Sequence, residues 1–112
     1  MKKIDVLTTE HSIISNLMHN PKLLSKLRLK PFMFADVNTQ KFVEFVLDKG
    51  KVDVNEIYYK SREDSEFIPI KLLTDIFNSN GTDKKFFMQD QLNILNNYIL
   101  NKARTEIGEF QS

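Results

Sequence analysis

The chain has 112 residues, with 16 Lys and Arg against 15 Asp and Glu, a formal net charge of +1, and no Cys or Trp. This length supports one hydrophobic core and excludes a second. The lack of Cys excludes disulfides and thiolate metal sites, and the near-zero net charge argues against a dedicated nucleic-acid binder. The apolar runs are only a few residues long, so we expect no membrane span, and the cytoplasm is the expected compartment.

Helix-start and helix-stop residues recur along the chain and predict an all-α fold. The first predicted helix begins at Thr8 or Thr9, has Glu10 in its first turn and ends near His19. Its buried face is predicted to hold Ile13, Ile14, Leu17 and Met18. Asn20 is expected to cap a short second helix, which buries Leu23, Leu24 and Leu27. The connector that follows is expected to supply aromatic core residues, and it reads Pro31-Phe32-Met33-Phe34.

The middle of the chain carries three more helix patterns. Asn38 is expected to open a helix that ends at Gly50 in a left-handed conformation. Its inner stripe is predicted to be Phe42, Val43, Val46 and Leu47. Asp53 and Glu56 have capping-box spacing, and Val52 can pack on Ile57 across the first turn of a helix that reaches about Lys60. After a charged loop over 61–66, a helix over 69–78 is predicted to bury Ile70, Leu73, Ile76 and Phe77 and to end at Asn80-Gly81.

The last predicted helix runs from Thr82 or Asp83 to about Phe110 and is the longest. Its apolar residues span about 200° of the helix circumference, wider than a surface helix needs. One stripe contains Met88, Leu92, Leu95, Ile99, Ala103 and Ile107, and an adjacent stripe contains Phe87, Ile94 and Tyr98. Either the domain covers both stripes itself, or another chain buries part of them. In the second case the protein-interaction residues are Leu92, Leu95, Tyr98, Ile99, Lys102, Ala103, Ile107 and Phe110.

The residues that would support catalysis or cofactor binding are missing. The chain has no P-loop, because no Gly precedes Gly50-Lys51 at the required spacing. His11 and His19 are about two helical turns apart and lack further imidazole or thiolate ligands, which argues against a metal site. Paired carboxylates such as Glu63-Asp64 lie in the charged stretch, and no Ser has the nucleophile-elbow context. We therefore predict that the protein is not an enzyme and has no cofactor.

The densest basic run is a candidate for weak nucleic-acid contact, and it consists of Lys22, Lys26, Arg28 and Lys30. Such a run is also typical of a hydrated helix face, and acidic residues elsewhere cancel its field. A helix-turn-helix reader is disfavoured, because a recognition helix starting at Asp53 would direct Asp53 and Glu56 toward phosphates.

The ordered set of features resembles the N-terminal (collar) domain of DnaB-type replicative helicases, over about residues 9–104. The resemblance rests on Glu10-His11-Ser12-Ile13-Ile14, Asn20-Pro21 with Leu24 and Leu27, Phe34, residues 38–42, Gly50-Lys51-Val52-Asp53 and Tyr98. The sequence departs from the family at Ser15, where Gly is usual, and at Gln40, near a common Arg. The linker and the ATPase motor of that family, with its Walker motifs, are absent from this sequence.

This resemblance implies a single domain over 1–112, a compact bundle of about five to six helices with a long C-terminal helix. It further implies a non-catalytic module of DNA replication, which self-associates and contacts primase, a helicase loader or the parent helicase in the primosome. Three alternatives stay open: a phage-encoded collar mimic that inhibits a host helicase or loader, the helicase-binding domain of a primase, and a small helical DNA-binding regulator.

Overall fold

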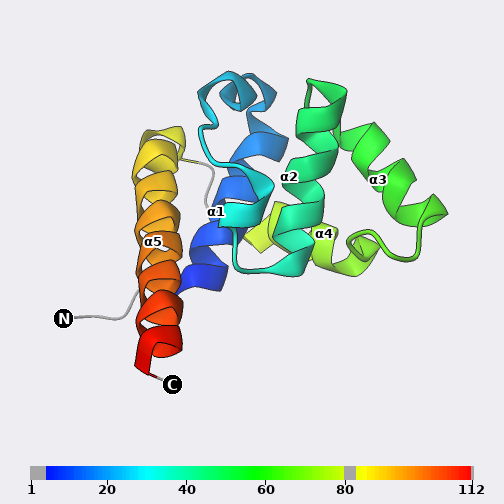
Figure 1. Ribbon diagram of the computed structural model, residues 1–112. Helices are drawn as coiled ribbons and strands as arrows, with labels where there is room; N and C mark the ends of the chain where they lie inside the picture. The colour runs from blue at the N-terminus through cyan, green and yellow to red at the C-terminus, as the bar shows by residue number, and fades with distance from the viewer. Residues whose placement is uncertain (1–4, 80–82, 112) are drawn as a thin grey trace.

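The computed structural model of the chain describes residues 5–79 and 83–111, with side chains for 5–78 and 83–104. Within these residues the fold is all-helical and ends in a long helix, as predicted. The α-helices are α1 (Val6–His19), α2 (Val37–Lys49), α3 (Val54–Glu63), α4 (Ile70–Ser79) and α5 (Phe87–Gln111) (Figure 1). The 3-10 helices are η1 (Pro21–Lys26), η2 (Pro31–Met33) and η3 (Lys84–Phe86). In this part of the chain, no helix has the length and apolarity that a membrane crossing requires.

The helix α1 occupies the centre of the bundle, with α5 along one side and α2 and α4 on others (Figure 1). All six residues from Ile13 to Met18 are buried, so neighbours surround this helix on every side. The predicted core face of α1 is therefore confirmed. Burial extends to Ser15 and Asn16, whose side-chain oxygens have no hydrogen-bond partner among the described residues.

Aspartates start α1 and α2 earlier than predicted. The Asp5 carboxylate accepts hydrogen bonds from the Thr8 amide at 3.2 Å and the Thr8 hydroxyl at 2.8 Å, so α1 begins at Val6. In the same way Asp36 accepts from the Thr39 amide at 3.0 Å and starts α2 at Val37. The predicted starts at Thr8 or Thr9 and at Asn38 were wrong, because the chain offers two capping residues close together at each place.

The predicted boundaries at Gly50 and Asp53 are confirmed. Gly50 follows α2 with φ of 74°, a left-handed conformation that a side chain would strain. Asp53 caps α3 by accepting from the amides of Asn55 and Glu56 at 3.0 and 3.3 Å. The Glu56 side chain forms an ion pair with Lys51 at 3.3 Å.

Other local predictions were wrong. The Asn20 side chain makes no capping hydrogen bond to η1, which is a 3-10 helix. Residues 61–63 belong to α3 and not to a loop. Three side chains predicted to be buried are exposed, because they lie at the edge of an apolar arc or on a short turn, and these are Phe32, Leu47 and Ile70. The predicted stop at Asn80-Gly81 lies outside the described residues.

Candidate interaction surface

Two faces of α5 have opposite environments. Phe87 and Ile94, at 0% and 1% exposure, face the bundle and pack in its core. The neighbouring face is open, with Leu92 51% and Ile99 53% exposed. Successive residues turn by about 100°, so Met88, Leu92, Ile99 and Ala103 fall on one side of the helix. We call these four residues the exposed stripe. The described part of the chain does not cover it.

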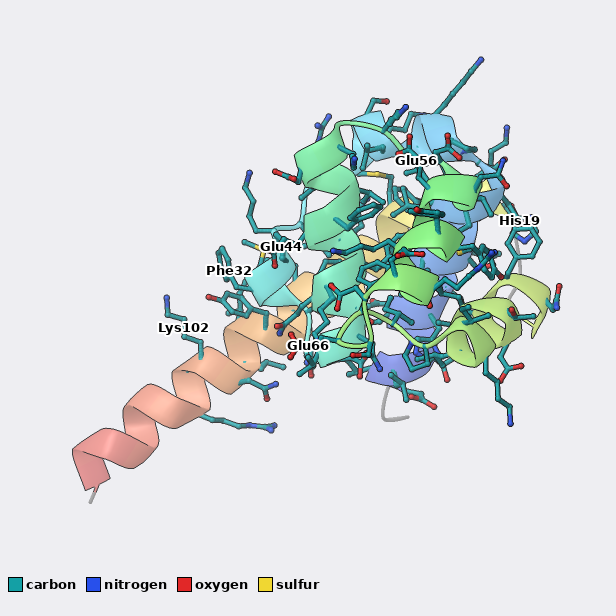
Figure 2. All side chains as sticks on the ribbon, turned by 90° about the vertical axis from the view of Figure 1, so that its right-hand side faces the viewer. His19, Phe32, Glu44, Glu56, Glu66 and Lys102 are labelled. Carbon is teal, nitrogen blue, oxygen red and sulfur yellow. The ribbon has the colours of Figure 1, made fainter. Side chains whose placement is uncertain are left out.

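The predicted interaction residues divide between this open face and its edge. Leu95 is half-buried against the core, and Tyr98 is half-buried with its ring edge toward Phe32 at 5.8 Å between centroids. Lys102 and Ala103 are exposed, on turns of α5 that extend beyond the globule (Figure 2). The side chains of Ile107 and Phe110, also predicted interaction residues, lie outside the described residues.

A buried amide on α5 holds the basic run in place. Gln91 is 4% exposed; its side-chain nitrogen donates to the Lys26 carbonyl at 3.1 Å, and its side-chain oxygen accepts from the Arg28 amide at 2.7 Å. These two bonds fix the chain after η1 against α5. The prediction from sequence missed Gln91, although a lone amide between Phe87 and Ile94 on an apolar face indicates a buried polar contact.

A buried carboxylate positions the start of α2. Glu10 is fully buried in α1 and accepts hydrogen bonds from the amides of Ala35 and Asp36 at 2.7 and 3.1 Å. Burial raises the pKa of the Glu10 carboxyl, while these backbone amides act to lower it. The prediction that Glu10 lies in the first turn of its helix was wrong, because α1 begins at Val6 and has no acidic residue in its first turn. The signal that it would be buried is its spacing from Ile13 and Ile14, which places it on the apolar arc.

The predicted nucleic-acid residues are all exposed, namely Lys22, Lys26, Arg28 and Lys30. Lys22 and Lys26 lie on η1, whereas Arg28 and Lys30 follow it, outside any helix. The interpretation as one helix face was wrong, because η1 is a 3-10 helix, in which residues three apart and not four apart are aligned.

One histidine, His19, and one of the paired carboxylates, Asp64, have structural partners. The His19 ring stacks on Phe77 at 4.0 Å between centroids, and its Nε2 lies 2.9 Å from the Phe77 carbonyl. Asp64 accepts from Lys60 at 3.0 Å and from the Glu66 amide at 2.9 Å, and the Glu66 hydrogen bond and the Lys60 ion pair lower its pKa. Within the described residues, no three His, Asp or Glu side chains are grouped to hold a metal ion.

Comparison with known proteins does not place the chain in a family. No protein-family model matches it, and searches of curated proteins and of solved structures find no match either.

Proposed function

We propose that this chain is a non-catalytic protein-interaction module of DNA replication, comparable to the collar domain of a DnaB-type helicase, and that it acts through the exposed stripe on α5. The observation that carries the proposal is the half-exposed state of Met88, Leu92 and Ile99 on the longest helix. Apolar side chains grouped on one helix face are typical of a partner-binding surface. The resemblance in sequence supplies the replication context.

The spacing along α5 favours a helical partner. Met88, Leu92, Leu95 and Ile99 follow each other at intervals of four, three and four residues, which is the heptad spacing of paired helices. The next position of this heptad is Lys102, whose exposed cation sits at the end of the apolar seam. A second copy of α5, or an amphipathic helix of primase, loader or helicase, fits this pattern.

Two double variants test this surface, and each adds two negative charges to the protein. Leu92→Glu/Ile99→Glu places carboxylates on the exposed stripe, while Tyr59→Glu/Val37→Glu alters two exposed apolar residues on α3 and α2. Light scattering over a range of concentrations should show a dimer or larger species for the natural chain and the control. We expect the stripe variant to dissociate at least about tenfold more readily, since charge in an apolar seam is disfavoured.

Partner capture gives the second readout. The natural chain and the control should retain primase, loader or helicase collar in a pull-down, and the stripe variant should not. A strict monomer that retains none of these partners would contradict the proposal. Addition of the chain to a helicase unwinding assay distinguishes a collar module from an inhibitory collar mimic, because only the mimic should inhibit unwinding at saturating concentration.

A further inference from the structure

Cationic side chains from distant parts of the sequence converge beside η1. A pocket of about 380 Å³ is lined by Lys22 and Lys26 of η1, Lys84 of η3 and His19 at the end of α1. The other lining residues are Asn20, Pro21 and Leu23, so no carboxylate lines it. The nearest acid in sequence, Asp83, forms an ion pair with Lys85 at 3.5 Å. This pocket therefore offers several positive charges without an internal counter-charge.

The positive charge continues along the chain that leaves the pocket. Leu27 and Leu29 are buried, while Lys26, Arg28 and Lys30 are exposed, so this stretch alternates its side chains between core and solvent. Its backbone is extended at Leu27 and Lys30, with ψ of 120° and 155°. Alternate residues of an extended chain are about 6.6 Å apart. The cations thus form a spaced row on one side, comparable to successive phosphates of an extended strand.

The local field of this row differs from the balance of the whole chain. There is no acidic residue between Glu10 and Asp36, although the net charge of the protein is only +1. Gln91 holds the backbone of Lys26 and Arg28 against α5, so the row has a fixed course. A preformed row of like charge attracts polyanions even on a nearly neutral protein.

An exposed aromatic ring stands at the far end of the row. Phe32 follows Lys30 after one proline, is 60% exposed, and meets the edge of Tyr98 at an interplanar angle of 64°. In Figure 2 His19, which lines the pocket, and Phe32 lie on opposite sides of the globule. Base stacking on aromatic rings is the sequence-tolerant part of single-strand recognition.

We propose that this row, from the pocket at Lys22, Lys26 and Lys84 to Phe32, binds single-stranded nucleic acid. The lysines and Arg28 contact successive phosphates, and Phe32 stacks on a base. An isolated phosphate would use the pocket but neither the continuing cations nor the ring, and an acidic peptide would use the cations alone. The site lies outside the exposed stripe, so it goes beyond the proposed protein-interaction function and is tested independently of it.

The first experiment measures binding of a fluorescein-labelled oligothymidylate of about 20 nucleotides by anisotropy, at several salt concentrations. Lys22→Ala/Lys26→Ala is compared with Lys49→Ala/Lys71→Ala, which removes the same charge from exposed positions on α2 and α4. The slope of log K against log salt is negative, and each lost phosphate contact reduces its magnitude by about 0.7, so we expect a magnitude smaller by about 1.4 for the first variant. The control should keep the natural slope.

The second experiment tests the ring with Phe32→Ala, which leaves the charge unchanged. We expect binding to weaken about 5- to 150-fold with the salt slope preserved, because stacking is not an ionic contact. Circular dichroism should show the natural helix content, since the ring is mostly exposed.

Four outcomes overturn the proposal. These are absence of salt-dependent binding, equal losses in the two lysine variants, no effect of Phe32→Ala, and binding of a duplex of equal length as tight as that of the single strand. Competition identifies other ligands: displacement by pyrophosphate at equal phosphate concentration assigns the pocket to free polyphosphate. Displacement by polyglutamate at equal charge assigns the row to acidic proteins. Either displacement would show that single-stranded nucleic acid is not the ligand of this site, and would also overturn the proposal.

Discussion

The helices α1 and α5 pack against each other, yet their apolar residues differ in how far they are buried. In α1 every residue from Ile13 to Met18 is buried, whereas α5 buries Phe87, Gln91 and Ile94 and exposes Leu92 and Ile99. The reason is position, because α1 has neighbours all round and α5 lies at the edge of the bundle (Figure 1). The apolar content of a helix indicates how much of its surface favours burial. The arrangement of the neighbouring helices decides whether the same chain buries that surface.

The largest expected effect comes from one substitution made on the two faces of α5. Ile94→Ala removes a side chain that is 1% exposed and should lower the free energy of unfolding by about 2–5 kcal/mol. Ile99→Ala, at 53% exposure, should change it by less than about 1 kcal/mol. Urea denaturation under conditions where the protein is monomeric measures both. Equal losses would show that the two faces are equally buried, against the comparison.

On α1 the strongest polar contribution should come from Glu10. Glu10→Ala leaves the partly buried amides of Ala35 and Asp36 without their acceptor and should lower the free energy of unfolding by about 1–3 kcal/mol. Glu44→Ala removes an exposed carboxylate from α2 and is the control. If both variants unfold at the same urea concentration, Glu10 does not hold the start of α2.

The amide on α5 should contribute somewhat less. Gln91→Ala removes both hydrogen bonds to the segment after η1, at a loss of about 1–2 kcal/mol in the free energy of unfolding. Hydrogen exchange at the Arg28 amide should accelerate, because its acceptor is gone. Gln89→Ala, at an exposed residue of the same helix, should leave that exchange rate unchanged. An unaltered exchange rate in Gln91→Ala would show that the Gln91 side chain does not hold the Arg28 amide.

The pH dependence of stability distinguishes the buried carboxylate from exposed ones. Burial raises the pKa of Glu10 above its ordinary value of 4.5, so the folded protein binds this proton more tightly than the unfolded chain does. Its contribution to the free energy of unfolding is then greatest below pH 4.5 and declines as the pH rises through the raised pKa. Urea denaturation at a series of pH values should show this decline relative to Glu10→Gln, which does not titrate. A difference that is constant with pH would contradict it.

The smallest effect is expected for Ser15 in the centre of α1. Its buried hydroxyl has no partner among the described residues, so Ser15→Ala removes a polar group that gains nothing from burial. The free energy of unfolding should stay the same or rise by up to about 1 kcal/mol. Thermal denaturation beside Ser25→Ala, at an exposed residue of η1, provides the comparison. A clear loss on replacing Ser15 would show that the hydroxyl has a partner.

Local chemistry made part of the fold predictable. The stop at Gly50 and the cap at Asp53 depend on residues within one turn, so the sequence indicates them directly. The core face of α1 is likewise a matter of helical spacing. Where two capping residues compete, as Asp5 and Thr8 do, the pattern allows either start, and hydrogen bonds from Thr8 to Asp5 decide it.

The surfaces depended on contacts between distant residues. Glu10 meets the amides of residues 35 and 36, and Gln91 meets a carbonyl 65 positions earlier in the chain, so neither partner is visible in local sequence. Phe32 and Phe34 are two residues apart in an apolar run, but a single 3-10 turn leaves the first exposed and buries the second. Spacing could identify two apolar stripes on α5 but could not decide which one faces α1.

The double hydrogen bond of Gln91 sets the rotational position of α5. A shift of this helix by one residue would turn it by about 100° and advance it by about 1.5 Å, which would separate the amide from both backbone partners. The exposed stripe of α5 therefore has one fixed orientation relative to the rest of the bundle. If a partner binds the exposed stripe, as we propose, little of the binding free energy is spent on reorienting this helix.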